Sequence, residues 1–242
     1  MNTLRKIAKK IPILSSIYRK LRNRYEFLQL RSQPPEAVFT NIYNSNRWGG
    51  TESVSGLGSD IHQTELIIKE LPVLFKEYQI ESVLDIPCGD FHWMKNMNLG
   101  NIHYIGADIV DALIESIAAQ YSEDGKIFQK INLIEDNLPR VDLLFCRDCL
   151  VHLSFQDILN ALYNICESNS EYLLTTTFTD RNQNDDIATG QWRTLNLELP
   201  PFNFPKPIKL INEGCTEYEG AFADKALGLW KISEIRETLP KR

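Results

Sequence analysis

Several features that would indicate other classes of protein are missing from this 242-residue sequence. No apolar run approaches the ~18 residues that a membrane-spanning helix requires, and there is no internal repeat or low-complexity tract. Cysteine is scarce, and its five residues fall at irregular spacings, which does not fit a disulfide framework. We therefore predict a globular protein of a reducing compartment, the cytoplasm.

Ligands for a metal are also scarce. The closely spaced pair Cys146 and Cys149 has no second pair to complete a zinc site. The pair ends a predicted strand, whereas a redox CxxC opens a helix, so we interpret both cysteines as small packed residues. No cluster of His and carboxylates has metal-ligand spacing, and we predict no metal.

Basic residues are unevenly distributed. Eight of the 26 Lys and Arg residues, and none of the 32 Asp and Glu residues, lie within residues 1–25. The rest of the chain therefore carries 18 basic and 32 acidic residues, a net charge of −14. So acidic a body argues against a nucleic-acid partner, because binding phosphate needs a basic face.

The basic N-terminal part is predicted to be an amphipathic helical extension, residues 1–33. Apolar residues recur at helical spacing through residue 28, with an interruption at Pro12, and Lys and Arg occupy the opposite face. Residues 1–31 fit a helix on an anionic membrane surface, at the inner face of the membrane. A helix packed on the domain or on a partner subunit fits equally well, and a mitochondrial presequence is a third alternative.

The central stretch of the chain is Val83–Phe91. Ser82 to Ile86 is an apolar run with a β-branched residue, and Pro87-Cys88-Gly89 ends it. A strand that ends in a Pro/Gly turn is typical of the first βα turn of a doubly wound sheet. Ligands bind beyond the carboxyl ends of such strands, where backbone N–H groups can face a charged group.

A second apolar strand, Ile102 to Ala107, ends in Asp108 about 20 residues after the glycine turn. A dinucleotide-type fold places a carboxylate at this spacing, because its oxygens can accept hydrogen bonds from two neighbouring ribose hydroxyls. A helix N-cap is the alternative role for Asp108. The two stretches together favour a nucleotide-binding fold.

Both stretches resemble motifs of class I S-adenosylmethionine (SAM)-dependent methyltransferases, whose first motif is a strand that ends in an acid and a Cys-Gly turn. This chain keeps one glycine of the turn, with Pro87 and Phe91 in two other places. The loop before the first strand resembles that of bacterial methyltransferases encoded with polysaccharide biosynthesis genes. The resemblance implies that residues 34–242 form a doubly wound, mostly parallel seven-stranded α/β sheet with a Rossmann-like methyltransferase fold.

The resemblance also implies that SAM is the cofactor, whereas an NAD fingerprint is missing from the glycine turn. Asn132, after the strand Lys126 to Ile131, would contact the adenine amine. The loop 46–59 would form a flap with Trp48 as an apolar wall, although Trp48 could also plug the core. The predicted cofactor-binding residues are Trp48, Asp85, Cys88, Gly89, Asp108, Ile109, Asn132, Leu133 and Arg147.

The remaining elements follow the same pattern. A helix is expected to start at Asp60, another at residues 91–94, and a third after Ser154. Apolar runs at residues 141–145 and 172–178 predict further strands, and residues 208–211 and 226–232 predict a closing antiparallel hairpin. The irregular segment 179–207, between the strand at residues 172–178 and this hairpin, is rich in aromatic residues and proline. We interpret it as a lid over an acceptor.

The predicted chemistry is methyl transfer to a hydroxyl of a small or glycan acceptor, as in sugar O-methylation of a surface polysaccharide or a nucleotide sugar. His152 is the predicted base, because imidazole titrates near neutral pH, and Asp148 would orient it or hold the hydroxyl. The alternative is that His152 only caps or packs beside the fourth strand. Some sugar O-methyltransferases use a divalent metal at this strand end, and Asp148 would be a ligand in that case. The alternatives are N-methylation of a small molecule or protein, and a silent subunit with a SAM fold. The predicted substrate-binding residues are Asp186, Trp192, Arg193 and Asn196.

Overall fold

The computed structural model describes residues 27–241, so the part of the predicted extension that precedes residue 27 lies outside the described residues. Residues 27–31 are helical. The helices are α3 (Pro35–Asn44), α4 (Ile61–Glu77), α5 (Asp111–Tyr121), α6 (Phe155–Glu167), the short turn α7 (Glu217–Gly220) and α8 (Ile232–Thr238). The strands are β1 (Ser82–Asp85), β2 (His103–Asp108), β3 (Lys126–Lys130), β4 (Leu143–Cys146), β5 (Tyr172–Phe178), β6 (Lys209–Asn212) and β7 (Lys225–Lys231).

The strands form a single seven-stranded sheet in the order β3-β2-β1-β4-β5-β7-β6. β1 to β5 pair in parallel, and β7 is inserted antiparallel between β5 and β6. The predicted mostly parallel, seven-stranded sheet with a closing hairpin is therefore confirmed. From β1 the chain continues to β2 on one side, and from β4 it continues to β5 on the other, so the loops after β1 and β4 leave the sheet in opposite directions. Ligands bind at such a switch point in doubly wound sheets.

Helices cover both faces of the sheet, as the unbroken apolar strands require. α6 and α8 pack against one face in a core that includes Leu84 and Leu144, and α4 and α5 pack against the other with Val83 and Leu143. Successive residues of β1 and β4 thus enter opposite cores, which is the period of two expected for strands buried on both sides.

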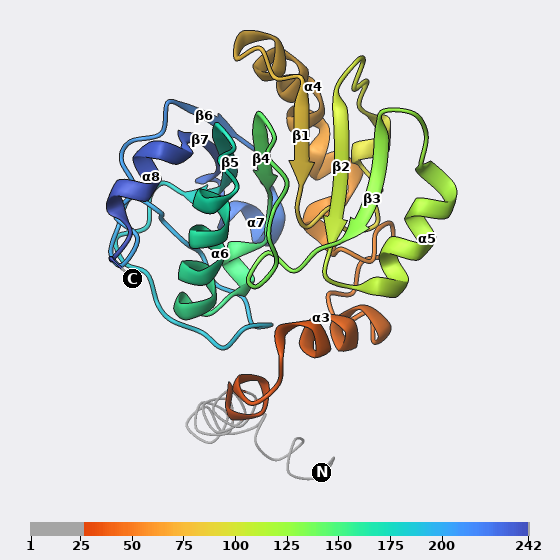
Figure 1. Ribbon diagram of the computed structural model, residues 1–242. Helices are drawn as coiled ribbons and strands as arrows, with labels where there is room; N and C mark the ends of the chain where they lie inside the picture. The colour runs from red at the N-terminus through yellow and green to blue at the C-terminus, as the bar shows by residue number, and fades with distance from the viewer. Residues whose placement is uncertain (1–26, 242) are drawn as a thin grey trace.

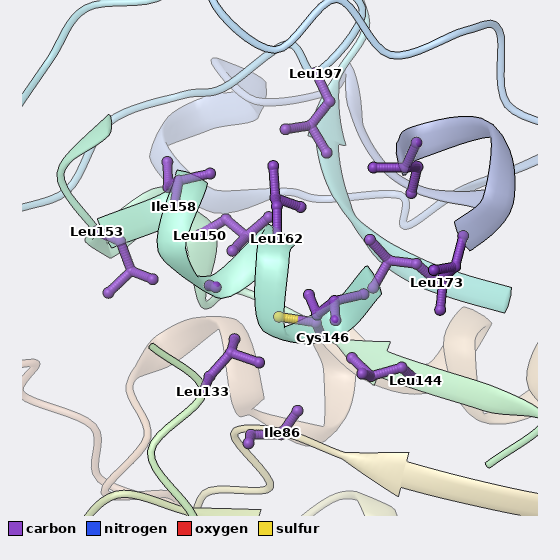
Figure 2. Close-up of a cluster of buried hydrophobic side chains, with 14 of the residues drawn as sticks. Ile86, Leu133, Leu144, Cys146, Leu150, Leu153, Ile158, Leu162, Leu173 and Leu197 are labelled. Atoms are coloured by element: carbon purple, nitrogen blue, oxygen red, sulfur yellow. The ribbon is translucent and has the colours of Figure 1, made fainter. Parts of the chain in front are cut away.

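The segment 179–207 is not a lid that stands apart from the domain. Leu195, Leu197, Phe202 and Phe204 are buried in the same core as α6. Figure 2 shows Leu197 within the cluster that also contains Leu162 of α6. The predicted lid is therefore mostly core packing, because its apolar residues pack with the buried face of α6 and its backbone bonds to the end of β5.

The prediction of a helix that begins at residues 91–94 is wrong. Only a 3-10 turn, Met94–Asn96, lies between β1 and β2. Asn96, Asn98 and Gly100 follow within a few residues, and these residue types favour turns over helix interiors. Asp60 does stand at the N-cap of α4, but its side chain makes no capping hydrogen bond; Glu52 accepts from the Ile61 N–H instead, at 3.2 Å.

α3 lies across the carboxyl ends of the strands, below β1, β2 and β3 in the orientation of Figure 1. Val38 and Ile42 of α3 pack with Leu30 and Ala188. Gly190 is required there, because a Cβ on it would lie 2.3 Å from Val38. α3 thus holds residues 188–190 of the long segment against the edge of the sheet where the site is expected.

Candidate active site at the carboxyl edge of the sheet

A cleft opens at the carboxyl ends of β1, β2 and β4, under α3 and the loop 46–59. Its enclosed cavity volume is about 130 Å³. All nine predicted cofactor-binding residues line this cleft, and so do Asp148 and His152. The cofactor-binding role of the nine residues stays a prediction.

The glycine turn is built by close contacts with the loop 46–59. Gly89 has φ +55°, and a Cβ on it would lie 2.2 Å from Ser55 Oγ. Asp90 accepts hydrogen bonds from the Ser53 hydroxyl at 2.9 Å and from the Val54 N–H at 3.0 Å. The loop is therefore fastened to the turn, and Trp48, Val54 and Ser55 become one wall of the cleft.

Asp85, at the end of β1, is 3% exposed and accepts a hydrogen bond from the Tyr104 hydroxyl at 2.5 Å. Burial raises the pKa of Asp85 to about 7, against the opposing effects of the Tyr104 hydrogen bond and the Arg147 charge. The carboxyl is thus poised to ionise near neutral pH. A cation bound in the cleft would favour the ionised form, because opposite charges stabilise each other at short range.

Asp108, at the end of β2, is also buried, and burial raises its pKa to about 6. Backbone N–H groups of Val110, Gly89 and Ile109 oppose this rise by hydrogen bonding to the carboxylate, with Val110 N at 3.0 Å from Oδ1. Asp108 precedes the N-cap of α5, which is Val110. The carboxylate therefore lies where the turn after β1 and the start of α5 meet.

Asn132 follows β3 and lines the cleft, but its amide already has partners. Its Oδ1 accepts from the Ile134 N–H at 3.0 Å, and its Nδ2 donates to Glu135 at 3.1 Å. This Asx turn fixes the direction of the side chain. A contact to an adenine amine would have to use the second lone pair of Oδ1.

His152 ends a 3-10 turn (Leu150–His152) after β4. Its Nδ1 lies 2.9 Å from the carbonyl oxygen of Gln191. A carbonyl can only accept, so Nδ1 carries the proton and Nε2 is left as an acceptor. Burial lowers the pKa of His152 to about 4, and Trp48 lies against the ring with centroids 4.9 Å apart. The ring is therefore a neutral, oriented imidazole, and the expectation that it titrates near neutral pH is wrong because burial disfavours its charged form.

Asp148 does not orient His152; that role falls to the Gln191 carbonyl. Asp148 Oδ2 lies 2.6 Å from Lys225 Nζ and 3.5 Å from Arg147. Burial alone raises its pKa, but Lys225 and Arg147 outweigh that effect and lower it to about 2. The residue has φ +52°, and its N–H donates to the Thr176 hydroxyl at 2.8 Å. Asp148 is thus an ionised carboxylate held facing the cleft.

Arg147 is buried in the same charge cluster. Its Nη2 donates to Glu213 at 2.7 Å and to the Gly58 carbonyl at 2.8 Å. Lys225 Nζ lies 3.3 Å from Glu213, so the two cations and two carboxylates compensate each other. Arg147 therefore lines the cleft mainly as part of this cluster and ties the loop 46–59 to β4.

The structure does not bring the four predicted substrate-binding residues into the cleft. Arg193 donates to the carbonyls of Leu150 and Leu153, and Asn196 donates to the Arg181 carbonyl. Asp186 accepts from the Phe155 N–H at the start of α6. The polar groups of these three residues hold the long segment together, and Trp192 lies outside the enclosed space with 45% of its surface exposed.

Several residues of the site were missed from the sequence. Phe39 and Tyr43 of α3 line the cleft, and Tyr104 positions Asp85 from within β2. The sequence offered a weak signal for Tyr104, since it is the one residue of that strand with a polar tip on an apolar body. Lys225 and Glu213 lie far along the chain from their partners Asp148 and Arg147, and the sequence offered no signal for them.

Two absences hold within residues 27–241. No group of three or more His, Cys, Asp or Glu side chains there is arranged to hold a metal ion. No helix in the same range combines the length and the apolar character needed to cross a membrane.

No protein-family model and no curated protein matches this sequence. Solved structures do match. The 1,6-didemethyltoxoflavin-N1-methyltransferase of Burkholderia thailandensis, with S-adenosylhomocysteine, has a TM-score of 0.60 at 14% identity, over 86% of this chain and 89% of that one. The N-methyltransferase NodS of Bradyrhizobium japonicum has a TM-score of 0.55 at 11% identity, over 79% and 98%.

Human N-acetylserotonin methyltransferase in complex with SAM has a TM-score of 0.57 at 16% identity, over 85% of this chain. This chain spans only 61% of the human enzyme's length. At these identities the comparisons define the fold. The chain has the class I fold of SAM-dependent methyltransferases, as its strand order and its cleft at the switch point also indicate.

Proposed function

We propose that this protein is an enzyme that transfers a methyl group from SAM to a hydroxyl of an acceptor. The observation that carries the proposal is the pairing, in one cleft, of two buried carboxyls at strand ends with a neutral, oriented imidazole. Bound SAM would supply a methyl group on a positively charged sulfur. The acceptor oxygen would attack this carbon as the carbon–sulfur bond breaks, and His152 Nε2 would accept the hydroxyl proton.

The lining of the cleft fits a cationic cofactor. Asp85, Asp90, Asp108 and Asp148 face the cleft, and Arg147 is compensated by Glu213. Burial raises the pKa of both Asp85 and Asp108, so a cation bound in the cleft would favour their ionised forms. The ammonium group and the sulfonium of SAM would supply that charge.

Replacing Asp108 by alanine is expected to weaken SAM binding by ~1–3 kcal/mol, because ribose hydroxyls would lose their acceptor. Isothermal titration calorimetry with SAM and with S-adenosylhomocysteine measures the change. Asp111→Ala is the matched control, since Asp111 is exposed at the start of α5 and does not line the cleft. Absence of any SAM heat from the unmodified protein, or binding of NADH in its place, would refute the cofactor assignment.

The same titration has an expected pH dependence. The pKa values of Asp85 and Asp108 are raised to about 7 and about 6, so both carboxyls lose their charge as the pH falls through this range. Affinity for the SAM cation should therefore rise between pH 5.5 and 8, with release of protons on binding.

The acceptor that we propose is a sugar hydroxyl, on a surface-polysaccharide precursor or a nucleotide sugar. The acidic body of the chain disfavours nucleic acid, and a general base suits a hydroxyl, whose proton must leave. Incubation with SAM and a panel of glycosides and amines, with detection of S-adenosylhomocysteine, tests the assignment. Product formed only with amine acceptors would indicate N-methylation, and SAM binding without turnover on any acceptor would indicate a silent subunit.

The basic extension is proposed to place the enzyme at the inner face of the membrane, in the cytoplasm. Deleting residues 1–26 removes all eight basic residues of that part and leaves Leu30, which packs on the domain. The shortened protein should keep its affinity for SAM and lose co-sedimentation with anionic liposomes, with neutral liposomes as the control. A shortened protein that is insoluble or loses its oligomer would show that the extension is a packing element.

A further inference from the structure

Beside the cleft, aromatic side chains form an exposed group that the proposed chemistry does not use. Tyr218 is 74% exposed and Trp192 is 45% exposed. Their ring centroids lie 5.5 Å and 4.9 Å from the ring of Phe222, which is packed in turn against the buried Phe178. The group Trp192, Tyr218 and Phe222, here named the aromatic platform, is therefore held from below but open to solvent.

The backbone holds Tyr218 in this exposed position at a conformational cost. Tyr218 and Glu219 have φ values of +51° and +60°, a region that residues with a side chain seldom occupy. Exposing a large aromatic ring adds to the cost. Strained residues of this kind concentrate at ligand-binding sites, where the surrounding structure maintains them.

Chain neighbours of the aromatic platform contact His152, Val151 and the region of Asp148. Trp192 follows Gln191, whose carbonyl holds His152, and the next N–H, of Arg193, donates to the carbonyl of Val151. On the other side, a Cβ on Gly58 would lie 3.3 Å from Asp148 Oδ2 and 3.5 Å from Glu217 Oε2. Tyr218 thus follows a residue whose carboxylate shares one small region with Asp148.

The charges around the aromatic platform argue against an anionic ligand. Arg181 is paired with Asp224 at 2.5 Å, Lys225 with Asp148 at 2.6 Å and Arg147 with Glu213 at 2.7 Å. A phosphate on the ligand would have to break one of these pairs and would face Glu217 and Asp148. The surface accordingly favours a ligand with apolar faces and neutral polar groups.

We propose that the aromatic platform binds a neutral sugar ring of the acceptor and presents one of its hydroxyls to His152 and Asp148. One face of a pyranose carries C–H groups that can lie on Trp192 or Tyr218, while its hydroxyls point sideways to the carboxylates. The inference rests on the proposed function and makes it more specific. It selects an uncharged sugar residue, as in a glycan chain, over a nucleotide sugar.

Saturation-transfer NMR on the full chain with S-adenosylhomocysteine present tests the aromatic platform. The probes are methyl α-D-mannopyranoside, methyl α-L-rhamnopyranoside and mannose 1-phosphate. The expected result is transfer to the ring C–H protons of at least one methyl glycoside, with affinity no weaker than that of the phosphate. Trp192→Leu and Tyr218→Leu should each weaken this binding about tenfold, the loss of one ring-sized apolar contact.

Tyr78→Leu is the control, because Tyr78 packs on Tyr172 at the start of β5, the opposite edge of the sheet. Circular dichroism melting confirms that all three variants are folded. Three results would overturn the inference. They are no transfer to either methyl glycoside, an affinity in Trp192→Leu and Tyr218→Leu equal to that of the unmodified protein, and tighter binding of mannose 1-phosphate than of the methyl glycosides. Calorimetry with S-adenosylhomocysteine separates this failure from failure of the proposed function, since the aromatic platform does not line the cofactor cleft.

Discussion

Replacing His152 by alanine is expected to lower turnover by a factor of ~100 or more and to leave the affinity for SAM unchanged, since a positioned base contributes about 10²–10⁴. The expectation rests on the tautomer: the Gln191 carbonyl holds the proton on Nδ1 at 2.9 Å and leaves Nε2 to accept. Steady-state rates with saturating SAM, measured beside calorimetric affinities, separate the loss of the base from a loss of binding.

The pH dependence of the same rates gives an independent check. A base must be neutral to accept a proton, and burial lowers the pKa of His152 to about 4. At saturating SAM, turnover through His152 should therefore stay constant down to about pH 5 and fall as the pH approaches 4. An imidazole in water would lose half of its basic form near pH 6.5.

His103→Ala is the matched control, because His103 is exposed at the first position of β2, on the opposite edge of the sheet. It should change neither rate nor affinity. Unchanged turnover in His152→Ala would remove His152 from the mechanism. Activity abolished by a chelator would instead assign the role to a metal at Asp148.

The fold and the carboxylates of the cleft could be predicted because their signals are local. Asp85 and Asp108 each end an apolar strand, and about 20 residues separate the glycine turn from Asp108. Carboxyl ends of parallel strands lie at one edge, so residues that end strands come together whatever the loops do. His152 and Asp148 follow β4 for the same reason, and all four residues line the cleft.

Contacts between distant segments could not be predicted in this way. Tyr104 looks like an apolar strand residue, and only the register, which pairs it with Val83, brings its hydroxyl to Asp85 two residues further along β1. Phe39 and Tyr43 reach the cleft because α3 crosses the strand ends. Their burial depends on tertiary packing and leaves no periodic trace near the motifs.

Three polar residues of the segment 179–207 were predicted to bind substrate but do not line the cleft. Asp186, Arg193 and Asn196 suit a carbohydrate site by residue type, but an irregular segment must also satisfy its own backbone groups. Arg193 and Asn196 do this by donating to carbonyls, and Asp186 by accepting from an N–H group. Residue type alone could not distinguish a side chain that binds a ligand from one that replaces missing secondary structure.

Replacing Glu213 by alanine is expected to lower the free energy of unfolding by ~3–5 kcal/mol, because it leaves a buried charge without its partner. Glu213 accepts from Arg147 at 2.7 Å and lies 3.3 Å from Lys225 Nζ. The side chains of Arg147 and Glu213 are 5% and 1% exposed, so water cannot replace the lost carboxylate. For a chain of this size the melting temperature should fall by roughly 6–20 °C.

Two further variants make the measurement specific to the buried charge. Glu77→Ala breaks the surface ion pair between Glu77 and Lys209, in which the side chains are 48% and 28% exposed, respectively. This change should alter the free energy of unfolding by at most ~1 kcal/mol. Glu213→Gln keeps an oxygen that Arg147 can donate to but removes the charge, so its melting temperature should lie between those of Glu213→Ala and the unmodified protein. If Glu213→Ala melts no lower than Glu77→Ala, the cluster does not stabilise the fold. We expect the larger loss of stability in Glu213→Ala because the charge cluster joins the end of β4 to β7 and to the carbonyl of Gly58 in the loop over the cleft.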